Sequence, residues 1–397
     1  MLTLGIDVAK YTHNATLLDA EGHKVFANFS FNNDQSGLDK LLEKIAAGGS
    51  TPEQIVIGME ATGHYWILLF EHLVKAGFDV KVINPIVTRA RRNITVRGGK
   101  TDAADSLLIA GILREGSVKV SAIPEDEVNR LRTLTRLRFD CAKAASSEKL
   151  RLIALLDVVF PEYKNHFSDV FGASSRVILS HFPTAAELAK VDIRRLTALL
   201  CDASRGRKGR EDAVRLKEAA RNSFARDLSD RNLALEIRFV VERLNLVVDQ
   251  IAELDQEIKN YYKDLQTLLK TVPGIADVWA PTILAEVLPV FHPERRNGSD
   301  AFVAMAGLDP RHNDSGRSTG RAKMSKRGSK YLRTAVMEAS EVAIGWSNDP
   351  MFKSIYDRQR AEGKPHMVAL SHVANKMLRV IFALLKTKEA YHPVLNN

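Results

Sequence analysis

The N-terminal part of the chain alternates between short apolar runs and longer stretches in which apolar residues recur every three or four positions. The short runs predict five strands, at residues 2–9, 13–18, 25–31, 54–59 and 78–84. The helical spacing predicts three helices, at residues 35–47, 64–76 and 102–115. Strands interleaved with amphipathic helices are typical of an α/β domain.

A different pattern begins at Pro124, where long amphipathic stretches replace the short runs. Helices are predicted at 125–158 and 232–270, and the second keeps one apolar face for about ten turns without Gly or Pro. Such a face predicts a helical hairpin or coiled-coil arm, and a core helix of a bundle would show it equally well. Between these helices lies a basic loop, residues 204–210, which is either a phosphate contact or a solvated turn.

A third region begins near residue 269 and is mainly helical. Residues 271–275, before the apolar stretch 278–288, resemble a helix-hairpin-helix turn, whose amides can contact a phosphate backbone. An apolar run at 301–308 leads into a loop rich in Gly and Arg. Three helices follow, at 331–344, 351–361 and 366–386. The sequence therefore predicts an α/β domain at 1–118, a helical coiled-coil region at 119–268 and a mainly helical domain at 269–397.

Charge separates these regions further. The chain has 397 residues and a formal net charge of +9, a basic excess that suggests a polyanionic partner. Residues 1–115 are balanced, with 12 Lys/Arg and 13 Asp/Glu, whereas residues 311–333 carry eight Lys/Arg against one acid. The candidate nucleic-acid contacts are Arg89, Arg91, Arg92, Arg97, Lys100, Arg311, Arg317, Arg321, Lys323, Lys326, Arg327 and Lys330.

Composition also bears on the compartment. Cys141 and Cys201 show neither zinc-site spacing nor a disulfide framework. The N-terminus lacks the basic and apolar segments of a signal peptide, and no 18-residue apolar run is present. We expect a soluble, cytoplasmic protein that does not contact a membrane.

Four acidic residues are candidates for metal-dependent chemistry. Asp7 lies within a predicted buried strand, where a carboxylate is costly unless it is paired or metal-bound. Glu60 ends the fourth strand, and α/β folds carry their chemistry at that end. Asp102 and Asp105 share one helix face, so their charges would repel without a cation, although such pairs also occur as caps or on solvated faces.

The order of the predicted elements is that of the ribonuclease H-like fold, in which the first strand, the fourth strand and the last helix bring their carboxylates together. Asp7, Glu60, Asp102 and Asp105 occupy those places. This agreement favours a metal site over four unrelated acids.

The chain also resembles a known family, the IS110 transposases of bacterial insertion sequences, which are DEDD recombinases guided by a bridge RNA. The resemblance rests on motifs that occur in the family's order: Gly5-Ile6-Asp7, Glu60-Ala61-Thr62-Gly63, Asn84-Pro85, Lys100-Thr101-Asp102-Ala103-Ala104-Asp105, Val272-Pro273-Gly274-Ile275, Ala306-Gly307-Leu308 and Ser315-Gly316. It covers residues 1–115 and 268–345, while the middle, 160–232, is longer than in compact members.

The resemblance implies a RuvC-like N-terminal domain whose metal-binding tetrad falls on Asp7, Glu60, Asp102 and Asp105, with Mg²⁺ as the cofactor. It also implies a C-terminal transposase domain whose nucleophilic serine falls on Ser315. It further implies dimers that assemble to tetramers, DNA as substrate, a bridge RNA as guide and action at the bacterial nucleoid.

Elementary chemistry is consistent with these roles and leaves alternatives open. A serine hydroxyl needs a cation or base to attack a phosphodiester, and the arginines that flank Ser315 can bind phosphate through forked donors. Ser318 and Ser325 are rival nucleophiles in the same loop. A junction nuclease could use the four acids to activate water directly. A nucleic-acid-binding scaffold without catalysis is a third possibility.

Overall fold

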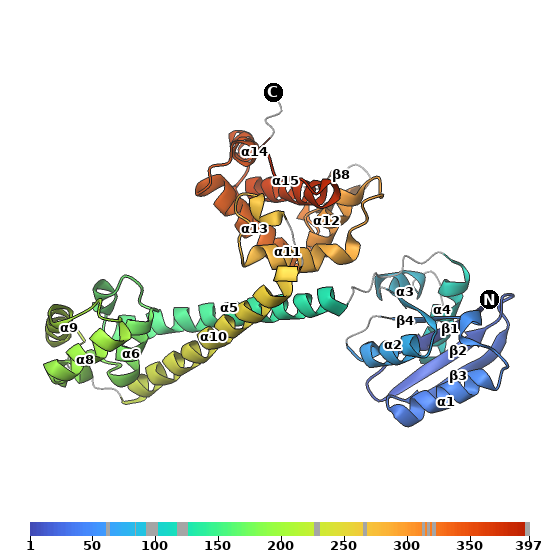
Figure 1. Ribbon diagram of the computed structural model, residues 1–397, viewed down its shortest axis with the longest axis horizontal. Coiled ribbons are helices and arrows are strands. Elements are labelled where there is room, and N and C mark those ends of the chain that lie inside the picture. The colour runs from blue at the N-terminus through green and yellow to red at the C-terminus, as the bar shows by residue number, and fades with distance from the viewer. Residues whose placement is uncertain are drawn as a thin grey trace. The chain divides into compact units, whose positions relative to one another are not determined.

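The computed structural model describes residues 1–60, 64–83, 85–92, 102–116, 126–225, 231–264, 268–311, 314–315, 318–319 and 323–393. The chain divides into two compact units, Met1–Ile123 and Pro124–Asn397 (Figure 1). Each unit has its own apolar cores.

The N-terminal unit is built on a mixed five-stranded sheet in the order β3-β2-β1-β4-β5. Its strands are β1 (Leu2–Asp7), β2 (Thr12–Leu18), β3 (Lys24–Asn32), β4 (Ile55–Glu60) and β5 (Asp79–Ile83). The first three are antiparallel neighbours, and β1, β4 and β5 run parallel. All five predicted strands are present, with ends shifted by up to two residues.

Helices cover both faces of this sheet. They are α1 (Gln35–Ala46), α2 (Trp66–Lys75), α3 (Pro85–Arg92) and α4 (Asp102–Arg114). One core joins α1 and α2 to Leu4 and Ile6 of β1 and to Ile57 and Met59 of β4. Alternate residues of a strand point to opposite faces, so the residues between them, beginning with Gly5, face α4. The mixed α/β character predicted for this region is confirmed.

The second unit contains two long helices, α5 (Asp126–Val159) and α10 (Arg231–Asp264), which pack along one another (Figure 1). Ion pairs cross between them, including Arg243–Glu148 at 2.9 Å and Arg151–Glu236 at 2.7 Å.

Five short helical segments pack against the C-terminal half of α5 and the N-terminal part of α10. They are η2 (Tyr163–His166), α6 (Ala173–His181), α7 (Ala185–Lys190), α8 (Ile193–Ala203) and α9 (Arg210–Asn222). Buried apolar residues of α8 and α9, with Tyr163 at their centre, join those of the long helices in one core. We call residues 160–225 the middle lobe.

The remaining helices form a C-terminal core around α15. They are η3 (Leu269–Thr271), α11 (Trp279–Val287), η4 (Leu288–Val290), α12 (Gly298–Ala306), α13 (Lys330–Gly345), α14 (Pro350–Ala361) and α15 (His366–Thr387). The three last helices lie where the sequence predicts them. In the proposed helix-hairpin-helix turn, Gly274 has φ +87° and touches α13, since a Cβ there would lie 2.0 Å from the carbonyl oxygen of Ala339. This contact gives the turn a packing role.

Among the described residues, α15 alone has the length and apolar composition to cross a bilayer. Half of that stretch is buried, and Val373, Met377 and Ile381 are fully enclosed by the neighbouring helices. The apolar character of α15 is thus accounted for by its place in the core.

Candidate functional site

Asp7 and Glu60 lie at one edge and on one face of the sheet. The parallel register pairs Ile6 with Met59, so the next residue of each strand brings these two carboxylates side by side. Neighbouring strands lie about 4.8 Å apart. Both residues alternate with positions in the α1–α2 core, so both face α4. Residues far apart in sequence thus meet at the carboxyl end of adjacent strands.

Asp105 belongs to α4, which lies directly on β1. A Cβ at Gly5 would lie 2.1 Å from the carbonyl oxygen of Ser106, so only glycine permits this approach. The Ser106 hydroxyl bonds to Thr16 Oγ1 at 2.9 Å and to Asn14 Oδ1 at 3.0 Å, and Asn14 is the β2 partner of Asp7. Asp105, next to Ser106, is buried. We call Asp7, Glu60 and Asp105 the carboxylate edge.

Asp102 begins α4, one turn before Asp105, and its side chain lies outside the described part of the structure. The helix therefore places its backbone on the face that carries Asp105.

Thr88 of α3 is a residue that the sequence analysis missed. Its hydroxyl donates to Glu60 Oε2 at 2.7 Å and also approaches the Pro85 carbonyl oxygen at 3.0 Å, and the residue is almost fully buried. The sequence signal for Thr88 is Pro85, which starts α3 directly after β5. A helix that begins there has its first turn beside the end of β4, where Glu60 lies. Thr88 orients the Glu60 carboxylate.

The carboxylate edge fits a hard divalent cation in its chemistry, since its donors are all oxygens. Among the residues that the structure describes, however, no three His, Cys, Asp or Glu side chains form a group able to hold a metal. Asp7 and Glu60 are therefore neighbours at the ends of β1 and β4, and Asp105 lies on the helix that packs on that face, but these three carboxylates do not by themselves form a metal-binding group.

The basic candidates of this unit lie on or after α3. Arg89 is exposed, and Arg91 forms an ion pair with Glu115 just after α4. The side chain of Arg92 and the whole of Arg97 and Lys100 lie outside the described residues.

Ser315 lies on a hairpin of the second unit. Strands β6 (Pro310–Arg311) and β9 (Lys323–Met324) pair at its base, and β7 (Asp314–Ser315) and β8 (Ser318–Thr319) pair further out, with Ser315 opposite Ser318. We call residues 309–325 the serine arm. The side chains of Arg311, Ser315, Ser318 and Lys323, and the whole of Arg317 and Arg321, lie outside the description.

The base of the serine arm is closed tightly. Ser325 Oγ donates to Asp309 Oδ1 at 2.5 Å, and its amide donates to the Asp309 carbonyl oxygen at 2.9 Å. Gly307 has φ +64°, and a Cβ there would lie 2.7 Å from the Gly328 amide. These contacts give Ser325 a structural task. Lys326 and Arg327, just beyond the base, are exposed.

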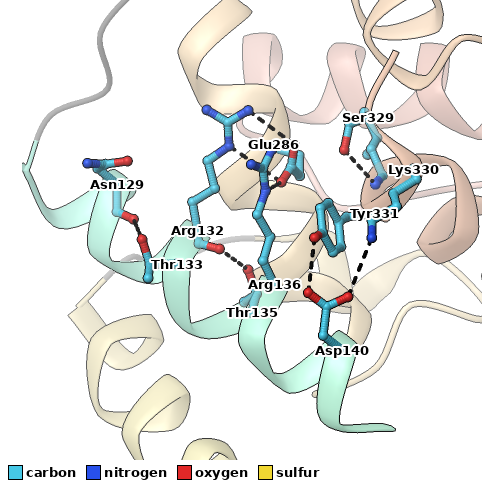
Figure 2. A network of polar contacts seen from close by, with 11 residues as sticks. Asn129, Arg132, Thr133, Thr135, Arg136, Asp140, Glu286, Ser329, Lys330 and Tyr331 are labelled. Atoms are coloured by element: carbon cyan, nitrogen blue, oxygen red, sulfur yellow. Dashed lines mark hydrogen bonds and ion pairs between the residues drawn. The ribbon is translucent and has the colours of Figure 1, made fainter. Parts of the chain in front are cut away.

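A buried ion-pair network at the start of α13 was also missed by the sequence analysis (Figure 2). Glu286 of α11 is fully buried and accepts from Arg136 Nε at 2.6 Å and Nη2 at 3.0 Å, with Arg132 Nε at 3.4 Å. Burial raises the pKa of Glu286, but Arg136, Arg132 and Ser329 more than offset this and hold the pKa below its ordinary value. The sequence signal for this network is Glu286 itself, the single acid in the apolar run 278–288, because a buried carboxylate requires a partner.

The same network fixes the start of α13. The Arg136 guanidinium lies 4.8 Å from the Tyr331 ring centroid, and the Tyr331 hydroxyl donates to Asp140 Oδ2 at 3.2 Å. Lys330, a candidate nucleic-acid contact, pairs with Asp140 at 3.5 Å, as Figure 2 shows. Helix α5 is thereby joined to α11 and to the start of α13, the helix that follows the serine arm.

Comparison with known proteins identifies the class. The family model for DEDD transposases of the IS110 type, described as "Transposase", matches residues 4–161. A second model, "Transposase IS116/IS110/IS902 family", matches residues 266–357. The first range contains the carboxylate edge and the second contains Ser315, while residues 162–265 lie outside both.

Full-length relatives agree. The chain is 27% identical to the 44.8 kDa protein of insertion element IS116 from Streptomyces clavuligerus, over 98% of this chain and 96% of that protein. It is 26% identical to the mini-circle putative transposase for IS117 from Streptomyces coelicolor, over 98% and 94%. A pilin gene-inverting protein of Moraxella bovis is 22% identical over 98% and 97%.

These matches define a transposase, an enzyme that acts on DNA. The chain belongs to the IS110 family of insertion-sequence transposases. DEDD transposases are in general metal-dependent, which accords with the oxygen donors of the carboxylate edge.

Proposed function

We propose that this transposase cuts and rejoins DNA strands through a covalent phosphoserine intermediate at Ser315, with Mg²⁺ bound by Asp7, Glu60, Asp102 and Asp105. The observation that carries the proposal is the strand register that sets Asp7 beside Glu60, on the face of the sheet that α4, the helix of Asp105, covers. The strand order, with two antiparallel and two parallel pairings, supports a RuvC-like, ribonuclease H-like domain.

Each group has a distinct task. A bound Mg²⁺ would neutralise charge on the phosphate that is attacked. Glu60, oriented by Thr88, and Asp7, fixed by the strand register, would present oxygens to it from neighbouring strands. Arg311, Arg317 and Arg321, close to Ser315 in sequence, would bind non-bridging phosphate oxygens through forked donors.

The covalent step keeps the bond count constant. Ser315 Oγ forms a bond to phosphorus as it loses its proton, while one P–O bond to deoxyribose breaks and that oxygen leaves as a hydroxyl. A hydroxyl from another strand then reverses the step and reseals the backbone. No nucleotide cofactor is needed, because a phosphoester replaces a phosphoester.

We further propose that a bridge RNA selects the DNA, and that dimers assembling to tetramers act on nucleoid DNA. The serine arm and the carboxylate edge belong to separate compact units, which is compatible with a catalytic site completed between protomers.

The test uses purified protein, Mg²⁺ and labelled DNA that spans the junction of the element with its flank, with and without RNA from the element's noncoding ends. The wild type is expected to form a covalent protein–DNA adduct, and peptide mass spectrometry is expected to place the phosphate on Ser315. Ser315→Ala should form none, whereas the matched variant Ser318→Ala should retain the adduct.

The alternatives give different results. A junction nuclease that activates water would leave Ser315→Ala able to cleave, with free DNA ends. An adduct lost in Ser318→Ala but kept in Ser315→Ala would move the nucleophile to Ser318. RNA that copurifies with the protein should be complementary to the element's ends and to its target. A protein that is fully active without RNA would refute the proposal that an RNA selects the DNA.

A further inference from the structure

The connection between α8 and α9 in the middle lobe is a compact basic loop. Ser204, almost fully buried, donates from Oγ to the Cys201 carbonyl oxygen at 3.2 Å and accepts from the Lys208 amide at 2.8 Å. Arg205 and Gly206 have φ of +54° and +78°, and the Gly206 amide closes the end of α8 on Cys201 at 2.8 Å. The loop therefore has a fixed backbone rather than the character of a loose linker.

This backbone presents cations to the outside. Arg205, Arg207 and Arg210 are exposed, and residues 203–210 contain no acid. Arg207 Nε donates to the Ser204 carbonyl oxygen at 3.1 Å, which holds its side chain against the loop. Positive groups at fixed positions lose little conformational freedom when they bind an anion.

A pocket of about 470 Å³ adjoins the loop. His166, Phe167, Lys208, Asp212 and Arg215 are among the residues that line it. Lys208 Nζ donates to the His166 carbonyl oxygen at 3.1 Å and lies 5.0 Å from the Phe167 ring centroid, so its charge is held at the wall.

Electrostatics make this pocket suitable for an anion. Its one acid, Asp212, already accepts from the Gly209 amide at 3.0 Å and from Arg215 Nη2 at 2.8 Å. Burial, followed by the charges of Arg215 and Lys208, lowers the pKa of His166, which leaves a neutral imidazole beside two cations at pH 7.

We infer that the loop 204–210 and its pocket form a second binding site for the phosphodiester backbone of nucleic acid, separate from the serine arm and the carboxylate edge. RNA and DNA share this chemistry, and fixed cations that flank a pocket suit a single strand, whose backbone can curve into it. The site lies within residues 162–265, outside both family models. It does not depend on serine chemistry.

The test compares two triple variants of the full-length protein with equal net charge. The loop variant is Arg205→Gln, Arg207→Gln and Arg210→Gln. The control is Lys190→Gln, Arg194→Gln and Arg221→Gln, which removes three exposed charges elsewhere in the same lobe. Fluorescence anisotropy would measure binding of a labelled single-stranded RNA, the same sequence as single-stranded DNA, and a duplex DNA, each over a range of salt concentrations.

The loop variant is expected to bind a single strand about tenfold more weakly, with the salt slope reduced by about 2, since each lost phosphate contact removes about 0.7. The control variant should change the affinity and the salt slope by only a small fraction of these amounts. Arg215→Gln should weaken binding in the same direction by a smaller factor. A larger loss with RNA would assign the site to RNA, and a larger loss with single-stranded DNA would assign it to a separated DNA strand.

Equal affinities and slopes for the loop and control variants with all three probes would overturn the inference. Thermal denaturation of each variant checks that the lobe remains folded. Failure of phosphoserine formation would leave this result unaffected, because the readout is binding alone.

Discussion

The carboxylate edge and the serine arm hold their candidate residues by different means. The carboxylate edge depends on backbone geometry, because strand register places Asp7 beside Glu60 and a glycine lets α4 approach β1. The serine arm is a hairpin whose base is closed by Asp309 and Ser325, and the side-chain network of Glu286 and Arg136 holds the start of α13, which follows it. The first arrangement is made by main-chain contacts, whereas the second is made by charged side chains. Substitutions can therefore test the backbone contacts of the carboxylate edge and the side-chain contacts near the serine arm one at a time.

The largest effect is expected for Asp7→Asn, which keeps the shape of the side chain and removes its charge. We expect the rate of DNA cleavage to fall about a thousandfold, because the variant loses the carboxylate proposed to bind the metal at the reacting phosphate. Cleavage of labelled DNA under single-turnover conditions measures this. Asp39→Asn, at an exposed position of α1, is the matched control, and an unchanged rate in Asp7→Asn would remove Asp7 from the site.

Gly5→Ala tests the backbone contact beneath the carboxylate edge. The new Cβ would meet the Ser106 carbonyl oxygen and the Ala110 amide, neither of which can move without α4. We expect the free energy of unfolding to fall by about 3 kcal/mol, as measured by urea denaturation.

Gly111→Ala, in the same helix, is the control. No atom lies within 4 Å of its added Cβ, so we expect a gain of up to about 1 kcal/mol from helix propensity. Equal effects of the two substitutions would show that α4 does not depend on contact with β1.

Glu286→Gln tests the ion-pair network at the start of α13. Removing the buried charge leaves Arg132 and Arg136 without their anion, but they are 22% and 34% exposed and regain some hydration. We therefore expect a loss of about 2 kcal/mol, below that of a fully buried pair. The exposed Glu253→Gln on α10 should change stability by much less.

The pH dependence has a defined sign. Because the folded state lowers the pKa of Glu286 from 4.5, its contribution is present above pH 4.5 and is lost as pH falls through the folded pKa. The stability gap between wild type and Glu286→Gln should thus narrow below pH 4.5 in denaturation curves. A gap that widens there would contradict the ion-pair explanation.

The smallest effect is expected for Thr88→Val, which removes the hydroxyl that orients Glu60 at nearly constant volume. We expect the Mg²⁺ concentration for half-maximal cleavage to rise about tenfold, as is common when a partner of a metal ligand is lost. Thr88→Ser should restore the wild-type value. Failure of Ser to rescue would indicate that Thr88 acts through packing.

Sequence patterns predicted the regular elements of both units well because their apolar periodicity is strong. The five strands and the helices α1, α2, α4, α5, α10 and α13–α15 all lie close to their predicted positions. The placement of Asp7 beside Glu60 followed from element order, because parallel strands bring their carboxyl ends to one edge of the sheet. The domain limits at 118 and 268 and the roles assigned to site residues stay predictions.

Other features depend on contacts between segments far apart in sequence. The pairing of Glu286 with Arg136 joins α11 to α5, and nothing local to either helix indicates the partner. The serine arm pairs two-residue strands, which are too short to show periodicity, so its sequence indicated only a loop. The short helices of the middle lobe, between residues 163 and 222, were not predicted from the sequence.

The contact between Gly307 and Gly328 has a consequence for engineering. Together with the bonds between Ser325 and Asp309, it holds the two ends of the serine arm against each other. A different tip could therefore be grafted between Asp309 and Ser325 without disturbing the helices beneath. Gly307 and Gly328 thus mark the limits of a segment that could be exchanged between relatives while its attachment to the helices stays the same.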